Sequence, residues 1–212
     1  MRGFQCGRTR GRDSVLVVCR GVTYVATMTD LTVEPKTASR ARMDAPELER
    51  EFRFAMRQVV APVSVVTTAI DGRPLGTTVS AFDSLSMSPP MMTVALRESS
   101  SLLAAVHPGT RLGLNVLRSD QAEVAMAFAA PIANRFGDVH WYLDGGVPRL
   151  RDLHAWIALS VRELVRGGDH VVLVCDVRGS ATGTGAPLVY HDRVFGTHAV
   201  CPVRELGDRL AG

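Results

Sequence analysis

The sequence has one lysine in its 212 residues, and it lacks clustered cysteines and long apolar runs. Its four cysteines stand at positions 6, 19, 175 and 201, without a CxxC pair or a Cys/His spacing that suits zinc or a disulfide framework. No stretch reaches the roughly 18 apolar residues of a membrane-spanning helix, so no membrane partner is expected. Free thiols in a reduced, cytoplasmic compartment are the simpler interpretation.

Positive charge is concentrated at the N-terminus. Residues 1–43 hold seven Arg, one Lys, two Asp and one Glu, a balance of +5. Because the whole chain has a net charge of +3, residues 44–212 carry −2. No basic stripe is interleaved with aromatic residues, so nucleic acid is not expected as a partner.

The chain divides into an extension and a folded body. The extension begins like a signal peptide, but Arg20 interrupts its apolar middle and leaves only Val15 to Cys19, which is too short. We expect residues 1–43 to be disordered, or to be an over-long reading of the gene whose start is Met28 or Met43. Residues 44–212 are expected to form one domain, since 46% hydrophobic and 21% charged residues are ordinary for a globular fold.

The folded body is predicted to begin with a helix and continue mainly as strands. A helix is expected over 44–61, capped by Asp44 and ended by Pro62. Asp71-Gly72 predicts a hairpin turn, and Gly and Pro separate most later segments. The predicted strands are 63–70, 76–85, 91–97, 111–117, 156–164, 170–178 and 187–190.

Two short helices are expected among these strands. One covers 99–107, and the other covers 119–130 with Ser119 as its cap and Val124 and Phe128 on one face. Many short strands with few helices favour a closed or partly closed barrel. The sequence has no G-x-G-x-x-G and no βα alternation, which argues against a Rossmann domain.

Three segments are candidates for binding or catalysis. In the stretch 76–86 the hydroxyls of residues 78, 80, 84 and 86 alternate, so a continuous strand would present them on one face to a polar ring edge or a phosphate. Ser99 to Ser101 open a predicted helix and form a possible anion site. Gly167-Gly168-Asp169-His170 places a histidine at a strand start, with its ring free to enter a groove. The ordinary alternatives are a solvent-facing strand, simple helix capping and a surface turn.

Other kinds of site find no support in the sequence. The remaining histidines, at positions 107, 140, 154, 191 and 198, have no metal-ligand spacing, so no metal site is expected. No G-x-S-x-G marks an exposed nucleophilic serine.

Together, these segments resemble the short-chain flavin reductases, the reductase components of two-component flavin-dependent monooxygenases. The resemblance covers roughly residues 48–198. It rests on FRFAMRQVVAPVSVVTT (52–68), DGRPLGTTVSAFDSLSMSPP (71–90), LGLNVLRSDQAEVAMAFA (112–129), RFG (135–137), GGVPRL (145–150), GGDH (167–170) and PLVYHDRVF (187–195).

The resemblance implies a mainly β, homodimeric split β-barrel of the Greek-key, FMN-binding type, with flavin near the subunit interface. The residues that match the segment lining the flavin ring and ribityl chain are Thr78, Ser80, Ala81, Phe82, Ser84 and Leu85. Those that match the phosphate-binding stretch are Ser99, Ser100 and Ser101, and Asn115 and Phe128 match positions close to the flavin. Those that match the NADH site are His170, Tyr190, Arg193 and Phe195.

The implied activity is hydride transfer from C4 of NADH, or NADPH, to N5 of FMN or FAD, with the reduced flavin passed to a partner monooxygenase. His170 would position the nicotinamide without acting as an acid or base. Two other functions remain open: a split-barrel flavin oxidase similar to the pyridoxamine-phosphate oxidases, and a non-enzymatic flavin-binding module.

Two positions depart from the family pattern. Ala61-Pro62-Val63 stands where Thr-Gly-Val is usual, and Pro62 has no N–H to donate to a ligand. Asp83 stands where a small neutral residue is usual, and a carboxylate beside an anionic reduced flavin is unfavourable unless it faces solvent. We therefore expect an atypical flavin site on a typical fold.

Overall fold

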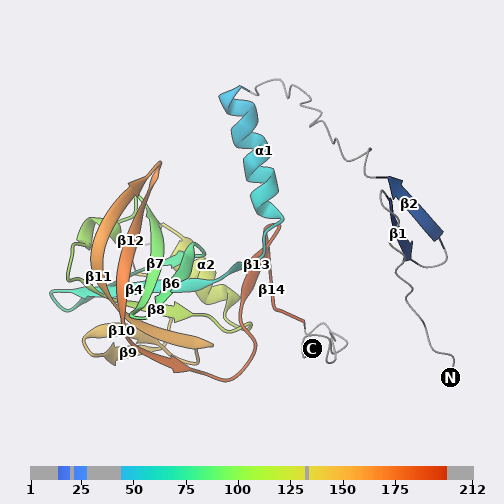
Figure 1. The fold of residues 1–212 in the computed structure, drawn as a ribbon. Helices are drawn as coiled ribbons and strands as arrows, with labels where there is room; N and C mark the ends of the chain where they lie inside the picture. The colour runs from blue at the N-terminus through green and yellow to red at the C-terminus, as the bar shows by residue number, and fades with distance from the viewer. Residues whose placement is uncertain (1–13, 20–21, 28–43, 132–133, 200–212) are drawn as a thin grey trace. The chain divides into compact units, whose positions relative to one another are not determined.

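The computed structural model describes residues 14–19, 22–27, 44–131 and 134–199 (Figure 1). The chain divides into two compact units, Met1–Arg50 and Glu51–Gly212. In the first unit, strands β1 (Ser14–Cys19) and β2 (Val22–Thr27) form an antiparallel hairpin. The rest of the stretch 1–43 lies outside the described residues, and the expectation for this extension stays a prediction. Within the described parts, no helix has the length and apolar character to cross a membrane.

Helix α1 (Ala45–Arg57) begins as the sequence predicts but ends earlier. The Glu47 N–H donates to Asp44 Oδ1 at 2.9 Å, which caps the helix. Ala61 and Pro62 form the short strand β3 instead of a last helical turn, because the residue before a proline favours extended backbone. No α1 side chain is buried, and Phe52 and Phe54 are more than 60% exposed.

A seven-stranded antiparallel sheet forms the centre of the second unit, in the order β5-β4-β8-β11-β12-β7-β6. Its strands are β4 (Ser64–Ile70), β5 (Arg73–Val79), β6 (Phe82–Met87), β7 (Pro90–Arg97), β8 (Arg111–Val116), β11 (Ala155–Gly167) and β12 (His170–Thr182). The fold of the described residues is thus mainly β, as predicted, with two α-helices, and hydrogen bonds do not close the sheet into a barrel.

Smaller elements surround this sheet. Strands β9 (Trp141–Asp144) and β10 (Val147–Leu150) form a hairpin, and β13 (Val189–His191) pairs with both β14 (Val194–Gly196) and β3. Helix α2 covers Ala122–Ala129 and η2 is a single 3-10 turn over Leu103–Ala105. The β9–β10 hairpin is absent from the predicted strands.

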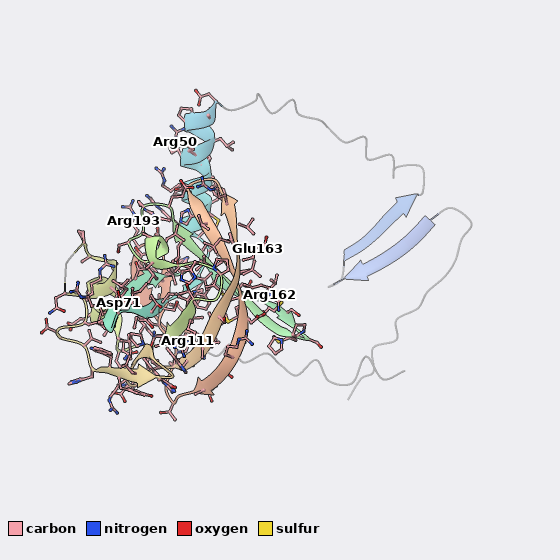
Figure 2. The ribbon with its side chains drawn as sticks, turned by 90° about the vertical axis from the view of Figure 1, so that its left-hand side faces the viewer. Arg50, Asp71, Arg111, Arg162, Glu163 and Arg193 are labelled. Carbon is pink, nitrogen blue, oxygen red and sulfur yellow. The ribbon has the colours of Figure 1, made fainter. Side chains whose placement is uncertain are left out.

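The hairpin joining β4 to β5 follows the turn signal in the sequence. Ile70 pairs with Arg73, and the two residues between them, Asp71 and Gly72, have φ values of 49° and 75°. Two consecutive positive φ values define the type I′ turn that suits the twist of paired strands. Asp71 is labelled at the tip of this hairpin in Figure 2.

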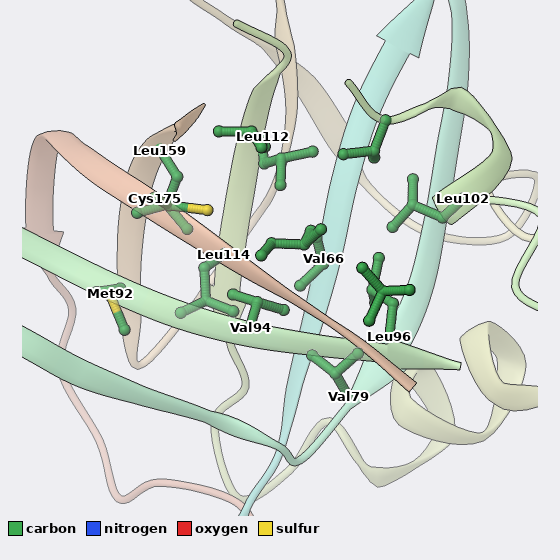
Figure 3. Close-up of a cluster of buried hydrophobic side chains, with 14 residues drawn as sticks. Val66, Val79, Met92, Val94, Leu96, Leu102, Leu112, Leu114, Leu159 and Cys175 are labelled. Atoms are coloured by element: carbon green, nitrogen blue, oxygen red, sulfur yellow. The ribbon is translucent and has the colours of Figure 1, made fainter. Parts of the chain in front are cut away.

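Both faces of the sheet are buried. Because side chains alternate along a strand, Val66 enters one hydrophobic cluster and the preceding Val65 enters the other. The first cluster includes Val94, Leu112 and Leu114 (Figure 3). The second cluster packs α2 and the β9–β10 hairpin onto the opposite face. This double covering explains why consecutive residues of β4 and β8 are buried, although the strands include Ser, Thr, Gly and Asn.

Candidate functional site

A cleft of about 570 Å³ brings together three segments that the sequence marks as candidates. Its walls come from the end of β5 and the link to β6, from the end of β7 with the turn after it, from the end of α2, and from the start of β12. The lining residues are Thr77, Thr78, Val79, Ser80, Ala81, Ala95, Leu96, Arg97, Ser99, Ser100, Ser101, Ala129, Arg135 and His170.

The link at Ser80 and Ala81 builds one wall by joining the two edge strands of the sheet. β5 ends at Val79 and β6 begins at Phe82, although these strands stand at opposite ends of the strand order. The Ala95 N–H donates to the Ala81 carbonyl at 2.8 Å and anchors the link to β7. The sheet edges therefore meet at the cleft.

The predicted continuous strand 76–85 is wrong because of this crossing. Thr78 and Ser80 line the cleft, but Ser84 lies beyond the break and is exposed on β6. Ser86 Oγ accepts a hydrogen bond from the Ser88 N–H at 3.2 Å. The expected row of four hydroxyls on one strand face does not form.

Helix α2 and the segment after it are tied to β5 behind the cleft. Thr78 Oγ1 donates to the Ala125 carbonyl at 2.6 Å. Arg135 donates from Nη1 to the Gly76 carbonyl at 2.7 Å and from Nε to the Ala130 carbonyl at 3.0 Å. Arg135 begins the RFG segment of the family resemblance but is not among the predicted site residues, because its two carbonyl acceptors are evident only in the folded chain.

The start of α2 also differs from the prediction. The N-cap position is Gln121 instead of Ser119, and no side-chain hydrogen bond caps the helix. The Gln121 Oε1 instead accepts from the Arg118 N–H, before the helix, at 2.9 Å. The Ser119 N–H is used elsewhere, since it donates to the Ala186 carbonyl at 2.9 Å. The predicted helix face is present, with Phe128 buried and Val124 packed on the same cluster.

Ser99 to Ser101 line the cleft from a turn, and the helix start predicted for them is wrong. Only the 3-10 turn at Leu103–Ala105 follows them, because three serines are poor helix formers and Pro108 limits the segment. The Ser100 N–H donates to the Arg97 carbonyl at 2.9 Å. Among the described residues the three hydroxyls have no hydrogen-bond partner, so they are available to a ligand without any helix dipole.

His170 begins β12 on the cleft wall, opposite Arg97 in the β7–β12 register. Gly168, with a φ of +67°, makes the tight turn that precedes it. His170 Nδ1 lies 2.7 Å from Asp169 Oδ1. This hydrogen bond holds the pKa of Asp169 below its usual value. The charge of His170 lowers the pKa of Asp169 further, and Arg97 has a smaller effect in the same direction. Asp169 thereby orients the imidazole ring.

Two predicted flavin residues are buried away from the cleft. Asn115 is fully buried, and its Nδ2 donates to the Val65 carbonyl at 2.9 Å while its Oδ1 accepts from the Leu150 N–H at 2.8 Å. Phe128 is also fully buried and lies behind β5, where a Cβ on Gly76 would be 2.8 Å from its ring. Both side chains support the cleft from the core.

The other predicted residues lie outside the cleft of their own chain. Phe82 is half-buried against the first core cluster, and Leu85 is 52% exposed. Tyr190 and Phe195 face each other across β13 and β14, with ring centroids 5.1 Å apart. Arg193 has a φ of 67° in the turn between these strands and is labelled in Figure 2.

Neither departure from the family pattern touches the cleft of this chain. Pro62 pairs with Val189 in the small sheet. Asp83 is exposed on β6, and its Oδ1 accepts from the Ser84 N–H at 2.7 Å. The Asp83 carboxylate thus faces solvent in the single chain.

A smaller cavity of about 270 Å³ lies toward the far end of β12, where it contacts Ala181 and Thr182. Two of its three arginines are ion-paired, Arg118 with Asp120 at 2.6 Å and Arg149 with Asp144 at 2.8 Å. No predicted site residue lines it, so the larger cleft is the candidate site.

Comparison with known proteins identifies the class. A family model described as "Flavin reductase like domain" matches residues 56–199. The chain therefore belongs to the flavin reductase-like domain family, a family of oxidoreductases, and the resemblance seen in the sequence is confirmed.

Individual relatives agree. The chain is 37% identical over 146 residues to the reductase component of a 4-nitrophenol 4-monooxygenase/4-nitrocatechol 2-monooxygenase of Rhodococcus opacus, covering 69% of this chain and 79% of that protein. It is 36% identical over 160 residues to a flavin reductase (NADH) of Kitasatospora aureofaciens, covering 73% and 82%. Some relatives are longer: the chain spans 41% of a probable flavin reductase of Rhizobium meliloti, at 35% identity.

Solved structures share the fold. A flavin reductase domain protein from Arthrobacter sp. FB24 superposes with a TM-score of 0.69 at 30% identity, covering 74% of this chain and 99% of that one. The flavin reductase PheA2 superposes with a TM-score of 0.66 at 29% identity, covering 72% and 99%.

Proposed function

We propose that this protein is an NAD(P)H-dependent flavin reductase that transfers hydride from NADH to FMN or FAD and supplies reduced flavin to a partner monooxygenase. The observation that carries the proposal is the cleft, which unites the Ser80–Ala81 link, the Ser99–Ser101 turn and His170. The relatives named as monooxygenase reductase components support the role of the partner.

The cleft has the size and chemistry for a flavin. Its volume of about 570 Å³ falls among small-molecule sites, which span roughly 300 to 1,000 Å³. Ala81, Ala95 and Ala129 leave room for a flat ring to approach the backbone. No carboxylate lines the cleft, which suits a ligand that carries phosphate.

In this proposal the bound flavin supplies the hydride-accepting ring system, and the protein supplies position and electrostatics. Ser80 and Ala81 meet the polar ring edge, and the hydroxyls of Ser99 to Ser101 hold the phosphate. His170, kept in place by Asp169, orients the nicotinamide. No residue need transfer a proton in the hydride step.

We also propose a homodimeric split barrel. Leu85 and Met87 on β6 are 52% and 80% exposed, and Phe52 and Phe54 on α1 are also largely exposed. Large apolar side chains gathered at a surface are typical of a protein–protein interface. Ser84 and Leu85, matched to the flavin, and Tyr190 and Phe195, matched to NADH, do not line the cleft of their own chain. A second copy is therefore their route to these ligands. Sedimentation equilibrium tests this: we expect a dimer that Met87→Ser weakens, and a monomeric wild type would refute it.

The activity is tested by anaerobic oxidation of NADH and NADPH with FMN, FAD and riboflavin offered in turn. We expect His170→Ala to raise the KM for NADH while leaving the flavin Kd unchanged, with the exposed His140→Ala as control. Unchanged NADH kinetics in His170→Ala would contradict the role of His170.

The same experiment separates the alternatives. Flavin that survives gel filtration and dialysis, with oxidation of a small amine or alcohol, would indicate an oxidase of the pyridoxamine-phosphate-oxidase type. Bound flavin without consumption of either nicotinamide nucleotide would indicate a binding module.

A further inference from the structure

Two arginines, Arg97 and Arg135, carry the positive charge of the cleft, and they differ in how many hydrogen bonds they already make within the protein. Arg135 donates hydrogen bonds from Nε and Nη1 to two main-chain carbonyls. Arg97 is exposed at the end of β7 and lines the cleft, and within the described residues it makes no ion pair and no side-chain hydrogen bond. Arg97 is therefore the cleft cation whose donors are free for a ligand.

The two carboxylates closest to Arg97 in sequence or register have other partners. Glu98 Oε1 lies 3.4 Å from Arg166 Nη1. Asp169 lies in the turn between β11 and β12 and is held by His170, the residue that pairs with Arg97 across β7 and β12. Because cross-strand partners point to the same face, the Arg97 and His170 side chains share one side of the sheet.

Arg97 also stands two residues before Ser99. A guanidinium beside three hydroxyls is the chemistry that recognises a phosphate group, the monoester of FMN or the pyrophosphate of FAD, through charge-assisted hydrogen bonds that an uncharged ligand does not form. We propose that Arg97 makes the cleft selective for phosphorylated flavins, FMN and FAD, over riboflavin. This inference rests on the proposed function, since it assigns a specificity determinant to the same site.

The test is a flavin-binding titration that needs no turnover. Quenching of flavin fluorescence gives the Kd of FMN and of riboflavin for the wild type, Arg97→Ala and Arg97→Lys. The matched control is Arg178→Ala, which removes an exposed arginine on β12. Its ion-pair partner Asp176 remains paired in this variant, because Asp176 also lies 2.6 Å from Arg162. Because Arg97 is exposed, its loss should not disturb folding, and circular dichroism checks this.

We expect Arg97→Ala to raise the Kd of FMN by about tenfold to a hundredfold, the loss of one charge-assisted hydrogen-bonding partner. Riboflavin should bind all variants equally, and Arg97→Lys should recover part of the FMN affinity. Added salt should weaken FMN but not riboflavin binding to the wild type.

Three results would overturn the inference. Equal losses for FMN and riboflavin would mean that Arg97 shapes the cleft without reading phosphate. An unchanged FMN Kd in Arg97→Ala would mean that Arg97 does not contact the flavin phosphate. If the same variant had a raised KM for NADH, Arg97 would instead bind the nicotinamide nucleotide. A wild type that binds no flavin would refute both proposals, whereas one that binds FMN selectively without oxidising NADH refutes only the reductase activity.

Discussion

Replacing Asn115 by alanine separates a structural role from a ligand role. The family pattern puts this residue close to flavin, but its side chain is fully buried and joins three strands. Its Oδ1 accepts the Leu150 N–H at 2.8 Å, and its Nδ2 donates to the Val65 carbonyl and to Thr67 Oγ1. Asn115→Ala leaves the buried Leu150 donor unpaired, which costs about 1 to 3 kcal/mol, and it also leaves a cavity.

We therefore expect Asn115→Ala to lower the free energy of unfolding by about 3 kcal/mol, or the Tm by roughly 6 to 12 °C for a domain of this size. Urea unfolding measures it, with the exposed Asn134→Ala as control at under about 0.5 kcal/mol. The FMN Kd of the folded variant should match the wild type. A loss below about 1 kcal/mol together with weakened FMN binding would refute this reasoning and place Asn115 at the ligand.

Asn115→Asp adds a test with a defined sign. A carboxyl at this buried position has its pKa raised above the unfolded value near 3.9, because burial disfavours its charged form. Its folded-state stability is then greatest below that unfolded pKa and falls as the pH rises through the folded pKa. Stability that instead rises with pH relative to the wild type would contradict the burial of this side chain.

Three further predictions concern the core and the cleft wall. Gly113→Ala should lower the free energy of unfolding by about 3 kcal/mol or abolish soluble expression, because the new Cβ would lie 2.0 Å from the Trp156 ring; a stable variant would contradict this packing. Burial raises the pKa of the Cys175 thiol to about 12, so peptide mapping after iodoacetamide treatment at pH 8 should find it unmodified in the folded protein and modified in urea. Thr78→Val should lose about 1 kcal/mol in urea unfolding, because its 2.6 Å bond to the Ala125 carbonyl disappears, and Thr78→Ser should recover it; equal losses would refute that bond.

Local signals in the sequence predict the elements well where one residue type dictates the backbone. Asp71-Gly72 specifies the turn between β4 and β5, because both residues tolerate the positive φ that this turn requires. Asp44 marks the start of α1, because its carboxylate accepts a hydrogen bond from a main-chain N–H of the first helical turn. Alternation and β-branched residues predict the strands of the main sheet for the same reason.

The sequence does not predict features whose structure depends on contacts between distant parts of the chain. Ser80 and Ala81 break an apparent strand only because β5 and β6 belong to opposite edges of the sheet. The partners of the buried Asn115 side chain, Val65 and Leu150, come from other strands and follow from no local pattern, whereas its match to a flavin position stays a prediction. Arg135 was missed because its acceptor, the Gly76 carbonyl, lies 59 residues earlier in the chain.

The way in which the link at Ser80 and Ala81 joins the two sheet edges has a consequence for folding. The cleft walls come from residues 77 to 170, so no single hairpin contains the site. Because β5 and β6 are consecutive in the chain but stand at opposite edges of the sheet, all the strands between them in the order must be paired for the two edges to meet at the cleft. A molecule bound there is therefore linked to the cooperative unfolding of the whole sheet, and its affinity adds to global stability by mass action. Thermal shift can thus rank candidate ligands before any reaction is known.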